Sequence, residues 1–550
     1  MNISKLVIKG FKSFKDRFYF ELNETVNIIV GDNEAGKSTI LEAINLALTG
    51  YYNGKPLRNN LTQYLFNDDL IKEYLLSLKS PAKQHPPEFF VELYFKETPE
   101  TAILIGDGNS SAISAPGVIF RVKFDEDYKA AYEDLIATGD IKTLPIEYYH
   151  VEWKAFSRES LTARNIPLKA AYIDSTSPRN SNGSDVYISR IVKDLLTSAE
   201  VVSVSQSHRK MKETFIEDPA VDAINKKIIA ASKITDKEVK ISVELSSQNA
   251  WENSLITCLD DIPFGYVGKG EQSIVKTNLA LSHNKAAEAN AVLIEEPENH
   301  LSHAKLNKLI KTIKDNCEEK QIIITTHSSF VANKLGLSDL ILLSNKKTTS
   351  LSKLGETTKE FFEKIAGYDT LRLILCKKAI LVEGDSDELV IQKAYMISNA
   401  GKLPIEDEIE VISLGVSFLR FLEIASILNK KTCVVTDNDG DVAALNRKYN
   451  DYLGANKKPN IDICFDPVVD TGGLIISGKN FNYNTLEPKF LKANGLQNVN
   501  SILGTTYTSI DEIHAYMKRN KTECAFKIFN HDNSGKVQIV FPQYILDAIQ

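Results

Sequence analysis

The sequence predicts an α/β protein that folds into more than one domain. A buried strand pattern at residues 26–30 is followed by a glycine-rich turn and then by helical periodicity. Further apolar runs of strand length end in polar or acidic residues, and helical patterns separate them. Strands that alternate with helices in this way favour a parallel sheet covered by helices. These runs are residues 291–294, 321–324, 378–382 and 432–435.

The composition is that of an ordinary globular protein. The 550 residues are enough for two to four domains, and 43% apolar with 25% charged residues is typical of globular folds. The opening residues lack a long apolar segment and no run is long enough to span a bilayer, so we expect neither a signal peptide nor membrane association. The six cysteines are scattered singly, which predicts neither a zinc site nor a disulfide framework and fits the cytoplasm. The net charge of −7 argues against bulk attraction to nucleic acid but permits a local basic groove.

Changes of pattern along the chain predict two domains, the first interrupted by a helical insert. Amphipathic helical faces in the insert would pack on its own domain or on a second subunit, and the sequence leaves both open. A short polar connection at residues 345–352 is part of the junction between the domains. The expected segments are 1–183 and 238–365 for the first domain, 184–237 for the insert and 370–550 for the second domain.

Local patterns in the first domain predict particular elements. Alternation over residues 6–22 predicts a β-hairpin, and a Ser/Asn/Gly/Pro-rich stretch at 175–184 predicts a loop. The other expected elements are strands at 89–95 and 118–124, and helices at 188–196 and 221–229.

Residues 31–39, GDNEAGKST, match the P-loop pattern in its required setting between a strand and a helix. Backbone N–H groups at a helix N-terminus form an anion site, so this loop is expected to bind ATP. We expect Lys37 to reach the β- and γ-phosphates and Ser38 to bind Mg²⁺. The alternative is a chance glycine-rich turn. The expected ATP-binding residues of the loop are Gly31, Asn33, Gly36, Lys37, Ser38 and Thr39.

Two later strand ends predict the rest of the ATP site. In residues 291–298, AVLIEEPE, Glu295 would contact the Mg²⁺ shell and Glu296 would polarise the attacking water. The alternative for this motif is a solvated acidic turn. His327 follows the run at 321–324, where it would contact the γ-phosphate or serve as a structural hydrogen-bonding residue.

A glycine turn that opens a helix is another site suited to an anion, and residues 267–272, VGKGEQ, form such a turn. The order of the four elements resembles the ABC/SMC-like ATPases, including the double-strand-break repair ATPases. In that family the glycine turn is the signature motif, which reaches the ATP held by the other subunit. The resemblance implies a homodimer with ATP between two copies, contacted by Lys269, Gly270 and Gln272. Lys269 stands where the family usually has Ser.

Carboxylates also gather at two strand ends of the second domain. Glu383 and Asp387 follow the run at 378–382, and Asp437, Asp439 and Asp441 follow the run at 432–435. Asp437 and Asp439 are two residues apart and would point the same way at a strand end. Hard oxygen ligands suit Mg²⁺ or Mn²⁺, and two such ions could cleave a phosphodiester. The alternatives are a simply solvated loop and a calcium-binding EF-hand loop, and the run lacks the closing Glu and the flanking helices of an EF-hand.

Glu-x-x-x-Asp followed by Asp-x-Asp resembles the TOPRIM domain of topoisomerases, primases and certain nucleases. An ABC-type ATPase followed by TOPRIM resembles the OLD (overcoming lysogenization defect) family of nucleases. The resemblance implies a Rossmann-like TOPRIM domain at the C-terminal end. It also implies that Glu487 binds metal and that Lys521 stabilises the charged transition state. Without the family context, Lys521 is an ordinary surface lysine.

The resemblance implies an ATP-regulated, metal-dependent DNA endonuclease or nickase. The family occurs in bacterial anti-phage defence, including Gabija and some retron systems, which implies a helicase or a reverse transcriptase with its nucleic acid as partner. The alternative is a DNA-binding ATPase switch whose TOPRIM domain docks a partner effector without cutting. The complete acid set favours the nuclease, because a docking module need not keep every ligand. The implied metal ligands are Glu383, Asp387, Asp437 and Asp439, with Asp441 and Glu487 as outer or second-ion ligands.

Overall fold

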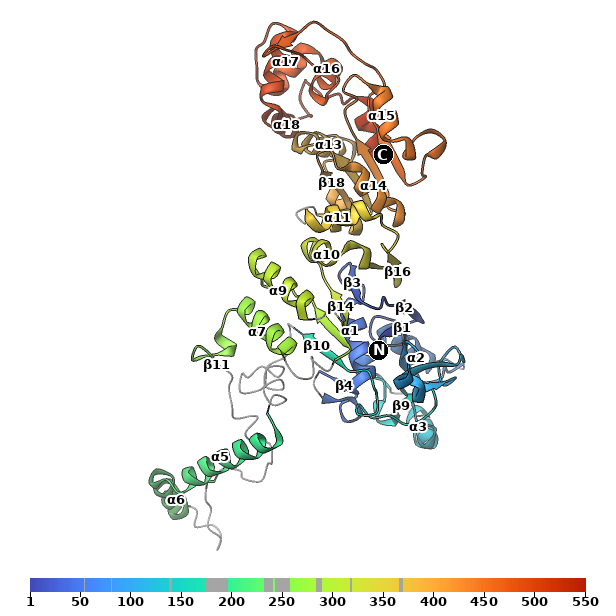
Figure 1. Ribbon diagram of the computed structural model, residues 1–550, viewed down its shortest axis with the longest axis vertical. Helices are drawn as coiled ribbons and strands as arrows, with labels where there is room; N and C mark the ends of the chain where they lie inside the picture. The colour runs from blue at the N-terminus through green and yellow to red at the C-terminus, as the bar shows by residue number, and fades with distance from the viewer. Residues whose placement is uncertain are drawn as a thin grey trace. The chain divides into compact units, whose positions relative to one another are not determined.

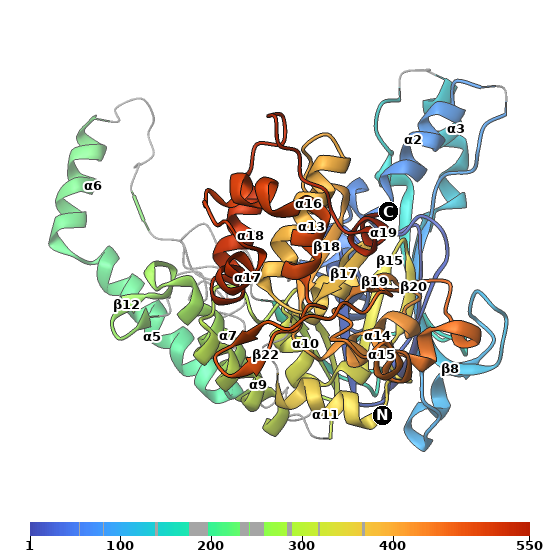
Figure 2. The same ribbon diagram turned by 90° about the horizontal axis from the view of Figure 1, so that it is seen from above.

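The chain folds into two compact units in the computed structural model. The first unit is Met1–Thr326 with Leu343–Thr348, and the second is His327–Leu342 with Thr349–Gln550. Figures 1 and 2 show the elements of each unit. The structure describes residues 1–53, 55–80, 82–137, 141–174, 196–231, 241–242, 258–282, 289–316, 319–365 and 369–550.

Two of the sequence predictions fall largely outside the described residues. The loop expected at 175–184 lies outside them, as does all but the last residue of the helix expected at 188–196.

An antiparallel sheet forms one layer of the first unit. Its order is β2-β1-β6-β8-β7, and β9 also pairs with β8. The hairpin predicted over 6–22 is confirmed as the antiparallel pair of β1 and β2, and the strands predicted at 89–95 and 118–124 are confirmed as well. The strands are β1 (Ile3–Lys9), β2 (Phe18–Glu21), β6 (Phe89–Phe95), β7 (Ile105–Gly106), β8 (Ala115–Phe124) and β9 (Tyr149–Ala155).

A second, mostly parallel sheet carries the P-loop strand. Its order is β10-β13-β14-β3-β15-β16, and β10, β13, β14 and β3 are mutually parallel. These strands are apolar along most of their length because helices and the other sheet bury them on both faces. Helix α1 (Lys37–Thr49) packs against the parallel strands. The strands are β3 (Val26–Gly31), β10 (Ala170–Asp174), β13 (Ala291–Glu295), β14 (Gln321–Thr325), β15 (Leu340–Ser344) and β16 (Lys347–Ser350).

The Gln321 side chain joins the two sheets of the first unit. Its Oε1 accepts the Ile3 N–H at 2.8 Å, and its Nε2 donates to the Ile3 carbonyl at 2.8 Å and to the Asn23 carbonyl at 2.7 Å. Gln321 is only 1% exposed, so these bonds satisfy backbone groups where water cannot. The amide therefore acts as a one-residue strand partner between β1 and β14.

Helices complete the first unit. Thr197 begins α5 with a capping box, in which its side chain accepts the Glu200 N–H and Glu200 bonds back to the Thr197 N–H. The helix predicted at 221–229 is confirmed within α6. No helix among the described residues is long and apolar enough to cross a membrane. The helices are α2 (Asp68–Ser77), α3 (Lys129–Ala137), α5 (Ser198–Ile216), α6 (Pro219–Ala231), α7 (Lys269–Ser282) and α9 (His303–Asn316).

The second unit contains a four-stranded parallel sheet in the order β18-β17-β19-β20. Helices α13, α16, α17 and α18 pack against one another beside this sheet, and both ribbon views show them together. Their apolar faces share one core with the strands, in which Ile380, Val390 and Phe490 are buried. The strands are β17 (Lys378–Val382), β18 (Ile409–Ser413), β19 (Lys431–Val435) and β20 (Ile461–Cys464).

The remaining elements of the second unit are mostly helices. The helices are α10 (Ser329–Leu335), α11 (Glu356–Lys364), α12 (Thr370–Leu375), α13 (Asp385–Ser398), α14 (Phe418–Ile427), α15 (Val442–Lys448), α16 (Leu486–Leu503), α17 (Ile510–Arg519), α18 (Lys521–Asn530) and α19 (Gln543–Ile549). Short hairpins are β4 (Tyr51–Tyr52) with β5 (Lys55–Pro56) and β11 (Cys258–Leu259) with β12 (Ile262–Pro263) in the first unit, and β21 (Ile475–Ile476) with β22 (Lys479–Asn480) in the second.

Candidate functional site

The P-loop turn requires its glycines. Gly36 precedes α1 with φ +111°, and a Cβ there would lie 2.8 Å from both the Phe14 ring and the Ser13 hydroxyl. At Gly31, a Cβ would lie 2.4 Å from the Leu343 carbonyl oxygen. No other residue type fits either position without displacing its neighbours. The loop conformation thus follows from the two glycines that the pattern contains.

Lys37 lies inside this loop. Its ammonium donates to the carbonyls of Gly31 at 2.8 Å and Asp32 at 2.9 Å. Burial lowers the pKa of Lys37, while Glu296, Asp32 and Glu298 oppose the shift through their negative charge. The structure therefore brings the P-loop lysine and the acidic end of β13 together at one edge of the parallel sheet.

The two glutamates after β13 have different surroundings. Glu295 Oε2 accepts the Tyr172 hydroxyl at 2.7 Å. Glu296 has φ +40°, its N–H donates to the Thr325 carbonyl at 3.0 Å, and its Oε2 accepts the Asn299 amide at 2.9 Å. A positive φ on a non-glycine residue stores strain that neighbouring contacts must hold. Glu296 therefore lies just after the end of β13, in a turn that its contacts with Thr325 and Asn299 hold.

Three other predicted residues lie on the same loop and helix. Thr39 is buried and its hydroxyl bonds to the Ser13 hydroxyl at 3.2 Å, while Ser38 is half-buried and Asn33 is exposed.

Glu298 was not among the predicted site residues. Its Oε1 accepts the Thr326 hydroxyl at 2.7 Å, and its negative charge acts to raise the pKa of Lys37. Its place in the same acidic run was the available sequence signal.

The glycine turn leads into α7, which begins at Lys269. A Cβ on Gly270 would lie 2.2 Å from the His300 carbonyl oxygen, so only glycine fits. The Gln272 amide donates to the carbonyls of Phe264 at 2.9 Å and Val267 at 2.7 Å. Its NH₂ group therefore holds the turn itself.

His327 belongs to the second unit, so its expected contact with nucleotide stays a prediction.

In the second unit, two neighbouring parallel strands bring the first acids together. The Thr436 hydroxyl donates to Glu383 Oε1 at 2.6 Å, and the Asp437 N–H donates to the same oxygen at 3.2 Å. Asp387 lies in the first turn of α13, where its Oδ2 accepts the Gly384 N–H at 3.1 Å. Strand ends and a helix start thus place three carboxylates at one edge of the sheet.

Burial and neighbouring negative charge raise the pKa of two of these carboxylates. Burial raises the pKa of Asp387 to about 7, and the charges of Glu383 and Glu487 add to this effect. Burial also raises the pKa of Asp437 to about 9, and the same two glutamates together with Asp387 add to it. Lys521 opposes both shifts. Residues from four segments therefore share one electrostatic site.

Glu487 and Lys521 close the site from the C-terminal helices. The Lys521 ammonium lies 3.0 Å from Glu487 Oε1, and the Thr485 hydroxyl donates to Glu487 Oε2 at 3.0 Å. Burial alone would lower the pKa of Lys521, but Glu487, Asp437 and Asp387 outweigh it and raise the pKa. A cation therefore lies beside the acid cluster, where a phosphate would need one.

The remaining two acids bond to partners outside this cluster. The strand β19 ends at Val435, and Asp439 has φ +48°, so strand alternation does not relate it to Asp437 as we expected. Asp439 is exposed and its Oδ1 accepts the Asn482 amide at 2.8 Å. Asp441 caps α15 by accepting the Ala444 N–H at 2.8 Å. The turn after the strand sends each side chain in its own direction.

Comparison with known families matches both units. Residues 1–332 match the family described as AAA ATPase domain. Residues 374–439 match the family described as Overcoming lysogenization defect protein-like, TOPRIM domain. The chain belongs to the AAA ATPase domain family. It is an ATPase–TOPRIM fusion of the OLD family, as the sequence motifs predicted, and its fold class is confirmed.

Proteins that are similar to this chain in sequence or in structure include SMC proteins. The curated chromosome partition protein Smc of Halobacteriovorax marinus is 48% identical over 44 residues, which are 8% of this chain and 4% of that protein. An SMC head bound to the C-winged helix domain of ScpA is 16% identical with a TM-score of 0.32, covering 64% of this chain and 99% of that one. The SMC head domain from Thermotoga maritima is 14% identical with a TM-score of 0.27, and the match covers 63% of this chain and 97% of that one. A third structure is an SMC head domain with an extended coiled coil, bound to the C-terminal domain of ScpA derived from Pyrococcus furiosus. It is 15% identical with a TM-score of 0.32, and the match covers 66% of this chain and 99% of that one.

The donors of the TOPRIM unit fit a divalent cation in chemistry. All of them are hard carboxylate oxygens, which Mg²⁺ and Mn²⁺ prefer. Burial beside other carboxylates raises the pKa of Asp387 and Asp437, and a divalent cation bound there would favour their ionised forms. Within the described parts of the chain, however, no three His, Cys, Asp or Glu side chains are gathered closely enough to hold an ion as they stand. Metal binding would therefore require these carboxylates to come closer together.

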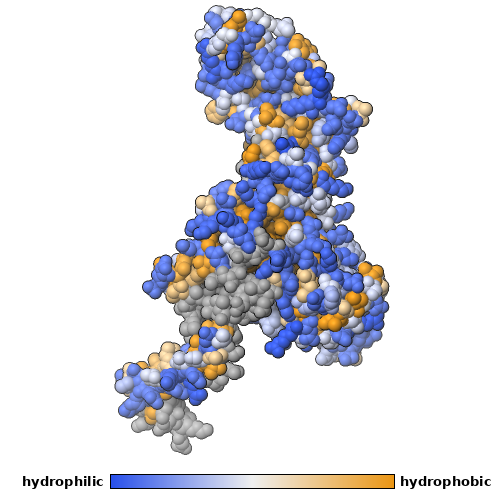
Figure 3. Space-filling view, in the orientation of Figure 1, coloured by the Kyte–Doolittle hydropathy of each residue, from blue (hydrophilic) through white to orange (hydrophobic). Residues whose placement is uncertain are grey.

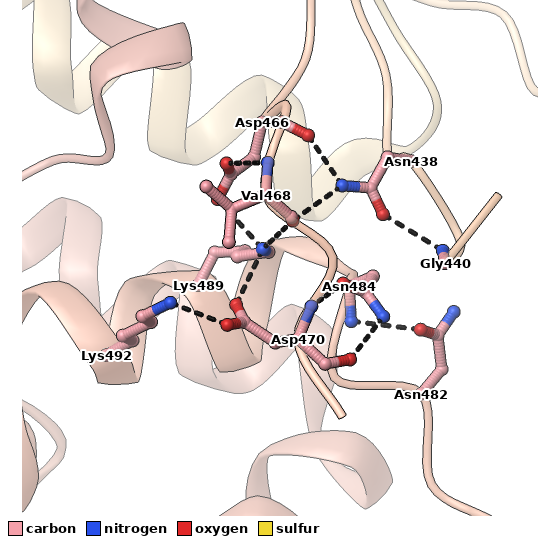
Figure 4. Close-up of polar contacts among 9 residues, drawn as sticks. All are labelled: Asn438, Gly440, Asp466, Val468, Asp470, Asn482, Asn484, Lys489 and Lys492. Atoms are coloured by element: carbon pink, nitrogen blue, oxygen red, sulfur yellow. Dashed lines mark hydrogen bonds and ion pairs between the residues drawn. The ribbon is translucent and has the colours of Figure 1, made fainter. Parts of the chain in front are cut away.

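A polar network beside the TOPRIM acids was not predicted from the sequence (Figure 4). It connects Asn438, between two of the acids, with the segment 466–470 and with Lys489 on α16. Lys489 is two residues after Glu487 and lies among buried neighbours. A lysine directly before the apolar pair Phe490 and Leu491 was the sequence signal, but its partners are distant in sequence.

Proposed function

We propose that this OLD-family protein is an ATP-regulated, metal-dependent DNA endonuclease or nickase. The observation that carries the proposal is the cluster of Glu383, Asp387, Asp437 and Glu487 beside Lys521. Four carboxylates whose charges act on one another, with a cation at their edge, suit the cleavage of a phosphodiester. A domain that serves only for docking has no need of this combination.

Each residue of the cluster has a proposed task. Divalent cations, when bound, would activate a water molecule and stabilise the leaving oxygen. Lys521 would neutralise the scissile phosphate once its pairing with Glu487 is exchanged for the substrate. The Thr436 hydroxyl would keep Glu383 oriented. The proposed ligands are Glu383, Asp387, Asp437 and Asp439, with Asp441 and Glu487 as outer or second-ion ligands.

The ATPase unit would regulate cleavage through nucleotide bound between two copies of the chain. Lys37 would bind the phosphates, and Glu296 would polarise water for hydrolysis. Tyr266 is 86% exposed directly before the glycine turn, and Ile262 nearby is 51% exposed. Exposed apolar side chains beside an anion-binding turn fit a surface that another copy covers. Helices α5 and α6 also expose apolar side chains (Figure 3), which are Val202, Met211, Phe215 and Ile224.

The cellular role that we propose is defence against phage in the cytoplasm. The family resemblance supports it, with a helicase or a reverse transcriptase as candidate partner. The measurement is plaque formation on cells that carry the gene with its neighbours, compared with cells that carry Asp437→Ala. Equal plaque numbers in wild type and empty cells would remove this role.

The first test of the nuclease is cleavage of supercoiled plasmid by purified protein. The reactions contain Mg²⁺ or Mn²⁺, with and without ATP. Asp437→Ala is expected to abolish nicked and linear product. The matched control is Asp462→Ala on β20, because Asp462 pairs with Lys457 at 2.9 Å, away from the acid cluster. Product from the wild type and the control alone would establish the nuclease. No product under any condition would favour the docking function instead.

A further inference from the structure

A buried lysine holds the loop that follows β20. The Lys489 side chain is only 3% exposed, and its ammonium lies 2.9 Å from Asp466 Oδ2 and 2.7 Å from Asp470 Oδ2. It also donates to the Val468 carbonyl at 2.7 Å. Burying an ammonium is costly unless it is paired and hydrogen-bonded. Its three acceptors come from one segment, so Lys489 fixes the path of residues 466–470.

The same segment contacts the acid-bearing turn through Asn438. This side chain is 3% exposed, and its amide donates to the carbonyls of Asp466 at 2.5 Å and Val468 at 3.0 Å. Its Oδ1 accepts the Gly440 N–H at 2.9 Å. Asn438 lies between two of the proposed metal ligands, so one side of that turn depends on the segment that Lys489 holds.

A second chain of contacts reaches the other side of the turn, and Figure 4 shows it from Asp470 through Asn484 to Asn482. The Asp470 N–H donates to Asn484 Oδ1 at 2.7 Å, and the Asn484 amide returns to the Asp470 carbonyl at 2.9 Å. The Asn484 N–H then donates to Asn482 Oδ1 at 2.9 Å. Asn482 finally donates to Asp439 Oδ1 at 2.8 Å. From Lys489 the contacts thus end on Asp439, whose positive φ needs such support.

We propose that Lys489 is a positioning residue of the nuclease site. It fixes the segment 466–470, and this segment aligns Asp437 through Asn438 and Asp439 through Asn482. Lys489 also lies two residues after Glu487 on α16. Its contacts therefore connect the helix that carries this C-terminal carboxylate to the segment that holds the acid-bearing turn. The inference rests on the proposed nuclease and explains how acids from separate segments keep a common geometry. A lysine that only stabilised the fold would have no effect on the affinity for metal.

The test compares Lys489→Met with Lys489→Arg and with Lys492→Met as the matched control. Lys492 is on the same helix and contacts the same Asp470 at 2.6 Å, but its side chain is 59% exposed. The first readout is Mn²⁺ binding by calorimetry without DNA. We expect Lys489→Met to weaken binding about 10- to 100-fold, as loss of a residue that orients metal ligands does. Lys489→Arg should recover most of the affinity, and Lys492→Met should match the wild type.

The second readout is plasmid cleavage, where Lys489→Met should lower kcat with little change in KM for DNA. ATP hydrolysis by the same samples reports on the other unit and should remain at the wild-type rate. Asn482→Ala removes the last bond to Asp439 at a half-buried position, so it tests the chain of contacts if Lys489→Met does not fold. It should also weaken Mn²⁺ binding.

The outcomes separate this inference from the proposed nuclease. Wild-type Mn²⁺ affinity in both Lys489→Met and Asn482→Ala would overturn the positioning role, even if the wild type cuts DNA. A wild type that binds Mn²⁺ but does not cut would overturn the nuclease, and the affinities would still decide the role of Lys489. A wild type that binds no Mn²⁺ would overturn both.

Discussion

The Thr436 hydroxyl donates to Glu383 Oε1 at 2.6 Å and so joins the ends of two neighbouring parallel strands. Replacing it with the isosteric valine in Thr436→Val leaves the carboxylate without this bond. We expect cleavage to fall about ten-fold, because a hydrogen bond to a charged group contributes about 1.5–3 kcal/mol and the Asp437 N–H remains. Thr436→Ser keeps the donor and should cleave normally. Plasmid cleavage rates measure both, and equal activity of all three proteins would contradict the prediction.

Lys521→Met should change two measurements in opposite directions. Cleavage should fall about 10²- to 10³-fold, because a positive group at the developing charge is lost. Metal binding without DNA should tighten about five-fold, because a unit charge a few ångströms from the acids no longer repels the ion. Calorimetry with Mn²⁺ and plasmid cleavage are the measurements. Weaker metal binding in this variant would show that Lys521 organises the acids instead of opposing the ion.

The metal-free protein should lose stability as the pH rises from about 4 to about 9. Burial raises the pKa of Asp387 to about 7 and that of Asp437 to about 9, so both carboxyls hold protons in the folded state that they release on unfolding. Their contribution is complete below the unfolded pKa of about 4 and is lost through the folded pKa, at up to about 1.4 kcal/mol per pH unit each.

Thermal unfolding in EDTA across this pH range measures the loss. Mg²⁺ should raise the unfolding temperature more at the alkaline end, because it neutralises the ionised pair. Asp437→Asn should show a shallower pH dependence than the wild type. An identical slope in the two proteins would mean that Asp437 is ionised throughout.

Gly270→Ala should destabilise the ATPase unit, because its Cβ would lie 2.2 Å from the His300 carbonyl oxygen. Overpacking of this kind costs about 1–3 kcal/mol. Gly268→Ala is the matched control, since a Cβ at Gly268 meets no described atom within 4 Å. Thermal unfolding of the two variants measures the difference. Equal unfolding temperatures would mean that Gly270 does not lie against the His300 carbonyl as it does in this structure.

Glu296→Gln should bind ATP and hydrolyse it at least about 100-fold more slowly, because the general base is lost. Trapped nucleotide should also shift the protein toward a dimer in sedimentation experiments. Lys37→Ala is the comparison, since it should abolish nucleotide binding altogether. A normal hydrolysis rate in Glu296→Gln would mean that another carboxylate, such as Glu298, polarises the water.

Local patterns predicted the strands and the P-loop because the causes are local. A short apolar run that ends in polar residues has few other structures open to it, and β13 and β19 follow this rule. The same logic failed beyond Val435. Asp439 takes a left-handed conformation that the following turn imposes, so the spacing of two residues no longer fixes a direction.

Other parts of the sites depend on contacts between distant segments. Gln321 joins two sheets through backbone groups of Ile3 and Asn23, and no pattern near residue 321 indicates it. Lys489 likewise finds Asp466 and Asp470 only after the domain has folded. Such partners are chosen by tertiary packing, which periodicity and motif spacing do not contain.

The pairing of Lys521 with Glu487 also has a consequence for genome surveys. The region matched to the TOPRIM family ends at residue 439, whereas this pair comes from α16 and α18, well beyond it. A gene selected only for its two acidic motifs would be counted as a nuclease even when these helices are missing. Under the proposed mechanism, sorting cutting from non-cutting relatives therefore calls for a search that includes the late glutamate and lysine as criteria of their own.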